Sequence, residues 1–99
     1  MEAYGGRKPR ILVVDDEVGV RESLRVILRP HCDVTTVESG QEGLDALPTF
    51  QPDVVFIDIK MPSMGGLEVL QRIKAYDPTV EGVMITAYEI GRASCRERV

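Results

Sequence analysis

Two short, uninterrupted apolar runs constrain the fold of this chain most strongly. Residues 11–14 (ILVV) and 54–57 (VVFI) each run directly into an aspartate. A strand with one face in water alternates apolar and polar residues, whereas a strand covered on both faces is apolar throughout. We therefore expect both runs to be central strands of a parallel sheet.

Helical patterns and further strand patterns alternate along the rest of the chain. Asp33–Val37 and residues 82–85 predict two more strands. Apolar residues at helical spacing predict three intervening helices. The first carries Val20, Leu24, Ile27 and Leu28 and ends at Pro30. The second begins with a capping box at Ser39 to Glu42, carries Leu44 and Leu47, and is followed by a loop bounded by Pro48 and Pro52. The third carries Leu67, Leu70 and Ile73 and ends at Pro78. This order predicts a parallel α/β sheet with right-handed crossovers.

The composition excludes several classes of protein. With 99 residues, 43% of them hydrophobic and 28% charged, the chain has the make-up of one globular domain. Its apolar runs are too short for a membrane helix and residues 1–10 do not form a signal peptide, so we expect a cytoplasmic protein. The net charge of −4 argues against direct nucleic-acid contact. Cys32 and Cys95 are too few for a disulfide scaffold, and His31 beside Cys32 indicates a loop at a helix end.

Polar residues end three of the predicted strands at the edge where parallel sheets bind ligands. Asp15 and Asp16 follow the first strand, Asp58 the third and Thr86 the fourth. Singly, Asp16 could cap the first helix, Asp58 could begin a turn and Thr86 could be an ordinary strand-end residue. Together, three converging carboxylates repel one another and raise at least one pKa unless a cation is bound. We therefore expect a Mg²⁺ site, beside which a carboxylate can become an aspartyl phosphate.

Three separated motifs resemble a known family. They are residues 11–17 (ILVVDDE), 54–70 (VVFIDIKMPSMGGLEVL) and 83–88 (VMITAY), and they resemble the receiver domain of bacterial two-component response regulators. The resemblance covers residues 10–88 and implies a flavodoxin-like, doubly wound parallel sheet with strand order 2-1-3-4-5. The amino-acid sequences of the last two motifs resemble those of receivers in sigma-54-dependent transcription activators.

The resemblance implies a role for each matched acidic residue. Asp58 would accept a phosphoryl group from the phosphohistidine of a sensor histidine kinase or phosphotransfer protein. Asp16 would bind Mg²⁺ directly and Asp15 largely through a bound water, and the Lys60 backbone carbonyl would be a further ligand.

The resemblance also implies a switch at the end of the fourth strand. Thr86 would be the hydroxyl that moves toward the phosphoryl group, and Ala87 would leave space for that movement. Gly65 stands where the family often has an acidic residue, which implies a more mobile loop after the acceptor. An output domain, such as a DNA-binding transcription activator, would lie outside this chain.

The end of the chain departs from the family. Receivers continue after the fourth strand with a helix, a fifth strand ending in Lys-Pro and a last helix, whereas residues 90–99 match the translation of a short-read sequencing adapter. A natural basic tail is the alternative. We therefore predict an N-terminal extension (1–9), an incomplete receiver domain (10–88) truncated after its fourth strand, and a non-native tail (89–99). The missing elements would leave the first helix and residues 83–85 partly uncovered and remove a cation from the site.

Two other functions compete with the phosphoacceptor hypothesis. A phosphatase of the haloacid dehalogenase type needs a second aspartate two residues after the nucleophile, and Lys60 occupies that place after Asp58. A receiver-like interaction module that is never phosphorylated would not need the acidic residues or Thr86, which are all present. The sequence therefore favours a regulatory phosphoacceptor domain over an enzyme.

Overall fold

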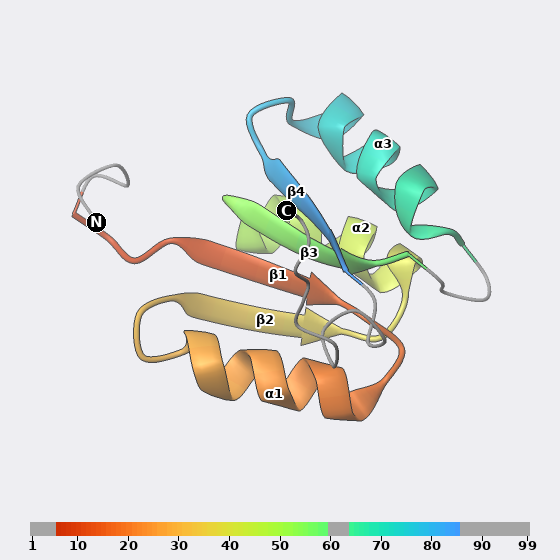
Figure 1. Ribbon diagram of the computed structural model, residues 1–99. Helices are drawn as coiled ribbons and strands as arrows, with labels where there is room; N and C mark the ends of the chain where they lie inside the picture. The colour runs from red at the N-terminus through yellow and green to blue at the C-terminus, as the bar shows by residue number, and fades with distance from the viewer. Residues whose placement is uncertain (1–5, 60–63, 86–99) are drawn as a thin grey trace, which may run out of the picture.

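A computed structural model describes residues 6–59 and 64–85 of the chain. These residues form strands and helices in the predicted alternating order (Figure 1): β1 (Arg10–Val14), α1 (Val18–Leu28), β2 (Asp33–Val37), α2 (Gly40–Phe50), β3 (Val54–Asp58), α3 (Gly66–Tyr76) and β4 (Glu81–Ile85). The strands form one sheet in the order β2-β1-β3-β4. Every neighbouring pair is parallel, which confirms the predicted sheet and places both apolar runs at its centre.

A reversal of winding direction places helices on both faces of the sheet. The chain crosses from β1 to β2 and then returns past β1 to β3 and β4, so right-handed connections put α1 on one face and α2 and α3 on the other. The contacts agree, because α1 packs on β1 and β2 whereas α2 packs on the same strands and on α3. Figure 1 shows this doubly wound arrangement. Within the described residues, none of the helices is long and apolar enough to cross a membrane.

The core lies between the sheet and the pair α2 and α3. Alternate residues of the two central strands meet the inner faces of these helices, giving a buried cluster of Leu12, Val14, Leu47, Val55, Ile57, Val69, Ile73 and Val80. Full burial of each such side chain stabilises the fold by about 1.5 to 3 kcal/mol relative to exposure. This core fixes the positions of the central strands and of the residues at their carboxyl ends.

The face that carries α1 is less completely covered. No residue of α1 is fully buried, and Val18 and Val26 are 61% and 58% exposed. The loop that follows α1 contains His31 and Cys32, whose backbone N–H groups donate to the Leu28 carbonyl. This confirms that the His-Cys pair lies in a loop at a helix end.

Two apolar residues that the helical spacing assigned to packed faces are exposed instead. Ile27 is 65% and Leu67 62% exposed, so these two assignments were wrong, although both helices are present. In α3 the buried ridge is formed by Val69 and Ile73, one turn apart. Leu67 lies about 200° around the helix from Val69, which carries it away from that ridge.

The helix α2 does not end before Pro48, contrary to the expectation from the sequence. It continues to Phe50 and ends at Gln51, which has a left-handed backbone with φ of 53°. Pro48 has no N–H to donate to the Leu44 carbonyl, and this weakens the last turn. Burial of Leu47 and packing of Phe50 against the core outweigh the missing hydrogen bond.

The start of α2 confirms the capping box in part. Ser39 Oγ accepts a hydrogen bond from the Glu42 N–H at 3.1 Å, while the Glu42 carboxylate accepts from the N–H of Glu38 at 3.0 Å instead of from Ser39. A Cβ at Gly40 would lie 2.5 Å from Cγ2 of Val69. The helix therefore uses a poor helix former at a point where α3 lies too close for a side chain.

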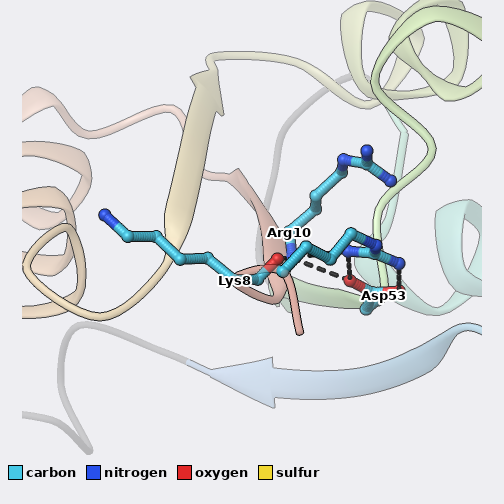
Figure 2. A network of polar contacts seen from close by, with 4 residues as sticks. Lys8, Arg10 and Asp53 are labelled. Atoms are coloured by element: carbon cyan, nitrogen blue, oxygen red, sulfur yellow. Dashed lines mark hydrogen bonds and ion pairs between the residues drawn. The ribbon is translucent and has the colours of Figure 1, made fainter. Parts of the chain in front are cut away.

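Residues 6–9 are held to the amino-terminal edge of the sheet. The Pro9 carbonyl accepts from the N–H of Asp33 at 2.9 Å. The guanidinium of Arg7 forms a bidentate pair with the Asp53 carboxylate at 2.8 and 3.0 Å, and the N–H of Arg10 donates to the same carboxylate at 2.8 Å. Figure 2 shows this network between the starts of β1 and β3, with the Arg10 guanidinium directed away from Asp53. The predicted extension therefore contributes contacts to the folded domain.

Candidate functional site

Three carboxylates meet at the carboxyl edge of the sheet. One oxygen of each of Asp15, Asp16 and Asp58 lies within 4.8 Å of the others. Asp58 is the last residue of β3 and the other two follow β1. Because Val14 lies opposite Ile57 in the parallel pair, the two strands end at the same level. The register of the central strands thus places the acidic residues together.

The backbone and side chain of Asp15 are tightly held. Its N–H donates to the Val37 carbonyl at 3.1 Å, its Oδ1 accepts from the N–H of Glu17 at 2.8 Å, and its carbonyl accepts from Nη1 of Arg21 at 2.8 Å. The residue is 1% exposed. Its other carboxylate oxygen, Oδ2, is buried and has no hydrogen-bond partner among residues 6–59 and 64–85.

Burial raises the pKa of the Asp15 carboxyl above its ordinary value. The Glu17 N–H opposes this shift, whereas the negative charges of Asp58 and Asp16 add to it. A raised pKa in this cluster agrees with the expectation from three converging carboxylates. The N–H of Glu17 therefore compensates the charged form of Asp15 only in part.

The donor set fits a hard divalent cation. All three groups offer carboxylate oxygen, two of them buried and the third, on Asp16, exposed to solvent. Mg²⁺ characteristically takes one or two carboxylates and keeps several waters. The unpartnered Oδ2 of Asp15 is a buried acceptor that a cation would satisfy. Asp16 thus gives the cluster a carboxylate that is open to solvent.

The structure excludes a helix-capping role for Asp16, and three predicted site residues lie outside the described part of the chain. The N-cap of α1 is Glu17, and no side chain caps this helix, so the interpretation of Asp16 as a helix cap is wrong. The predicted ligand Lys60 and the predicted switch residues Thr86 and Ala87 lie outside the described residues.

Gly66 lets α3 begin directly against the end of β3. A Cβ at this position would meet the backbone oxygen of Asp58 and would lie 3.0 Å from Cγ2 of Ile57. At the neighbouring Gly65, a Cβ would have nothing within 4 Å. The close approach at Gly66 fixes the end of β3 against the first turn of α3.

One residue at this site was not singled out from the sequence. Arg21 is half-buried in α1 and bonds to the Asp15 carbonyl. It lies three and seven residues before Leu24 and Leu28, so it shares the packed face of the helix. The charge of Arg21 on an otherwise apolar helix face is the sequence feature that could have identified it as a site residue.

The described residues also line an open pocket of about 440 Å³ at the opposite edge of the sheet. Arg10, Asp53, Tyr76 and Val80 contribute to its lining. These residues begin β1 or lie beside the starts of β3 and β4, far along the strands from the acidic cluster. The pocket is therefore separate from the carboxylate site.

Comparisons with known proteins agree with the fold. The profile of the family described as "Response regulator receiver domain" matches residues 11–94. The DNA-binding transcriptional regulator NtrC of Klebsiella pneumoniae is 43% identical over 77 residues, which make up 77% of this chain and 16% of NtrC. Sporulation initiation phosphotransferase F of Bacillus subtilis (strain 168) is 35% identical over 80 residues, or 80% of this chain and 64% of that protein.

Solved structures show the same architecture. The N-terminal domain of a response regulator receiver protein from Methanoculleus marisnigri JR1 has a TM-score of 0.72 at 40% identity, covering 79% of this chain and 66% of that one. A CheY-like response regulator receiver domain protein from Methanospirillum hungatei JF-1 has a TM-score of 0.78 at 30% identity, covering 83% and 66%. With a family profile that spans most of its length, this chain belongs to the response regulator receiver domain family.

Proposed function

We propose that Asp58 is the phosphoacceptor of this receiver domain, in a two-component signalling pathway. The observation that carries the proposal is the position of Asp58 at the end of β3, 7% exposed, with a carboxylate oxygen within 4.8 Å of those of Asp15 and Asp16. In the reaction, an Asp58 oxygen attacks the phosphorus of a phosphohistidine, the P–N bond breaks, and the imidazole leaves and takes up a proton.

The acidic cluster is proposed to hold Mg²⁺ during this reaction. Asp15, Asp16 and Asp58 would supply carboxylate oxygens, with the Lys60 backbone carbonyl as a further ligand. When bound, the ion would neutralise charge on the carboxylates and on the phosphoryl oxygens. The unpartnered, buried Oδ2 of Asp15 supports this assignment.

The remaining site residues are proposed from the resemblance to receivers. The Thr86 hydroxyl would donate to a phosphoryl oxygen and act as the switch, and Ala87 would leave room for it. A regulatory phosphoacceptor suits this chain better than a phosphatase of the haloacid dehalogenase type, because Lys60 occupies the position of that family's second aspartate.

The partners are proposed on the same basis. The phosphoryl donor would be a sensor histidine kinase or a phosphotransfer protein in the cytoplasm, and the output domain would lie outside this chain. Residues 10–88 would be an incomplete receiver domain, followed by a non-native tail at 89–99. Amplifying the source gene across the codon of Tyr88 tests the tail, and a genomic sequence that encodes residues 90–99 would contradict its adapter origin.

A small phosphodonor with Mg²⁺ tests the acceptor directly. In the full-length parent protein, we expect the mass to rise by one phosphoryl group, and this gain to vanish in Asp58→Asn and in EDTA. Asp45→Asn, which changes an exposed aspartate on α2 in the same way, should be phosphorylated like the wild type. A mass gain that survives Asp58→Asn would exclude Asp58 as the acceptor, and no gain in the wild type would favour an unphosphorylated interaction module.

Titration of Asp16→Ala tests the metal ligands separately. Asp16 is exposed, so its removal should disturb the fold little while it weakens Mg²⁺ binding and Mg²⁺-dependent phosphorylation strongly. An unchanged Mg²⁺ affinity in this variant would contradict the assignment of Asp16 as a ligand.

A further inference from the structure

The side chain of Arg21 connects the first turn of α1 to the end of β1. Its Nη1 donates to the backbone carbonyl of Asp15, six residues earlier, at 2.8 Å. Its own N–H donates to the Glu17 carbonyl at 3.1 Å, as the helix requires. The loop between β1 and α1, which carries two of the acidic residues, is therefore closed by a side chain from the helix.

The Asp15 carbonyl needs this donor because it lies beyond the sheet. The pairing of β1 with β3 ends at Val14 and Ile57, and among the described residues no backbone N–H donates to the Asp15 carbonyl. A backbone carbonyl in a residue that is 1% exposed requires a partner inside the protein. Arg21 supplies that partner from a half-buried position on the packed face of α1.

Fixing this carbonyl fixes the position of the next residue as well. The peptide group that joins Asp15 to Asp16 is planar, so the direction of the carbonyl determines the direction of the following N–H and Cα. The Asp15 N–H and Oδ1 are already held by Val37 and Glu17. The bond from Arg21 completes the set, and of the polar atoms of Asp15 only the carboxylate oxygen Oδ2 has no partner within the described part of the chain.

We infer that Arg21 is a positioning residue for the acidic site. Through the Asp15 carbonyl, it orients the peptide between Asp15 and Asp16 so that their carboxylates converge with that of Asp58. This inference rests on the proposed cation site, because its functional consequence is the affinity of that site for Mg²⁺. Arg21 contacts neither a carboxylate nor a cation in this role.

The charge of Arg21 alone would have the opposite effect. A guanidinium near a cation site repels the cation, so removing it would strengthen Mg²⁺ binding if charge were its only influence. Loss of a positioning contact instead weakens binding, and partners that orient metal ligands typically account for about 10- to 100-fold in affinity. The sign of the change in Mg²⁺ affinity therefore distinguishes the two roles.

The test compares variants of the 99-residue chain by Mg²⁺ titration calorimetry. Arg21→Met should raise the Kd for Mg²⁺ by about tenfold or more. Arg25→Met is the matched control, because it removes the same charge one turn later on α1, where the side chain pairs with Glu22. It should leave the Kd unchanged or slightly lower. Arg21→Lys keeps the charge but loses the guanidinium geometry, and should give a smaller rise.

Amide hydrogen exchange in EDTA provides a readout that needs no metal. Loosening of the loop should speed exchange at the Glu17 N–H in Arg21→Met but not in Arg25→Met. An unchanged or lower Kd together with unchanged exchange at Glu17 would overturn the inference. If Arg21→Met does not fold, an unchanged Kd and exchange rate in Arg21→Lys would overturn it.

The same experiment separates this inference from the proposed function. If the wild type fails to bind Mg²⁺, the proposed cation site is wrong. The exchange rate at Glu17 then decides alone whether Arg21 positions the loop, and equal rates in the wild type and Arg21→Met would overturn the inference.

Discussion

Replacing Asp15 by asparagine should stabilise the metal-free chain and remove its stabilisation by Mg²⁺. Asp15 is 1% exposed, and its carboxylate lies within 4.8 Å of that of Asp58. Two unit charges at this separation repel by about 3 kcal/mol at an effective dielectric constant of about 20. Asparagine removes this repulsion and keeps an oxygen that can accept from the N–H of Glu17.

The net gain should be smaller than the repulsion between the charges. The hydrogen bond from Glu17 weakens by about 1 kcal/mol when its acceptor becomes neutral. We therefore expect the free energy of unfolding in EDTA to rise by about 1 to 2 kcal/mol at neutral pH. Mg²⁺ should then add little, because a buried carboxylate oxygen of its site has become a neutral amide oxygen.

The gain should depend on pH in a defined direction. Because burial raises the pKa of Asp15, the folded protein binds this proton more tightly than the unfolded chain does. The wild type therefore loses stability as the pH rises from the ordinary aspartate value of 3.8 through the raised folded value. The gain in unfolding free energy of Asp15→Asn over the wild type should be largest above the folded pKa of Asp15 and should vanish below pH 3.8.

Asp53→Asn is the matched control because it makes the same change of charge at the opposite edge of the sheet. The Asp53 carboxylate accepts from Arg7 and from the N–H of Arg10. These bonds are partly exposed, so their loss should lower stability by about 1 kcal/mol. Urea unfolding followed by circular dichroism, in EDTA and in Mg²⁺, measures all three proteins. Destabilisation of Asp15→Asn in EDTA, or an undiminished response to Mg²⁺, would refute the reasoning.

Three further outcomes follow from contacts elsewhere in the domain. The Arg7 guanidinium lowers the pKa of Asp53, so the charged Asp53 should stabilise the fold above pH 3.8, and this stabilisation should be lost as the pH falls through the lowered folded pKa. A difference in unfolding free energy between the wild type and Asp53→Asn that persists in strong acid would contradict this. Gly66→Ala should lower the free energy of unfolding in urea by about 2 kcal/mol or more, whereas Gly65→Ala should leave it nearly unchanged, because only a Cβ at Gly66 meets the backbone of Asp58. An equal loss in both variants would argue against this close approach. Lys74→Met should lower the free energy of unfolding by about 1 kcal/mol and speed amide exchange in the α3–β4 loop, because the Lys74 ammonium donates to the Val80 and Pro78 carbonyls at 2.7 and 3.3 Å. Unchanged exchange in this loop would count against the prediction.

The order of elements could be predicted because the two kinds of apolar pattern differ so clearly. Both continuous runs lie in central strands. The run in β1 is buried on both faces, whereas Val54 and Phe56 in β3 are half-buried. Local rules failed where packing outweighed them. Pro48 weakens one turn of α2, but burial of Leu47 keeps that turn helical. Leu67 has the hydrophobicity of a core residue, but the ridge that reaches the sheet passes through other positions.

The acidic site could be predicted as a set of residues but not as a geometry. Asp15 and Asp58 end adjacent parallel strands, so strand order alone brings them to one edge. Strand order does not reveal which oxygen lacks a partner, because that depends on the bonds from Glu17 and Arg21. Both bonds arise from the path of the loop after β1, which residue spacing does not specify.

The exposed apolar residues on α1 and β4 lead to a final prediction about stability. Val26 and Ile27 are 58% and 65% exposed, and Val83 is 39% exposed. Among the described residues, β4 is an edge strand with no neighbour on its outer side. Full burial of such a side chain is worth about 1.5 to 3 kcal/mol, so covering the exposed half of these three should add about 3 kcal/mol.

A chimera provides the measurement. Residues 89–99 are replaced by the end of a natural receiver, with its fifth strand and last helix, and the chimera is compared with the 99-residue chain by calorimetry and light scattering. A gain of about 3 kcal/mol in a domain of this size should raise the Tm by roughly 10 °C or more. The shorter chain should also aggregate sooner, because β4 offers an unpaired edge. An equal Tm and equal aggregation would show that the apolar residues of α1 and β4 gain nothing from such a cover.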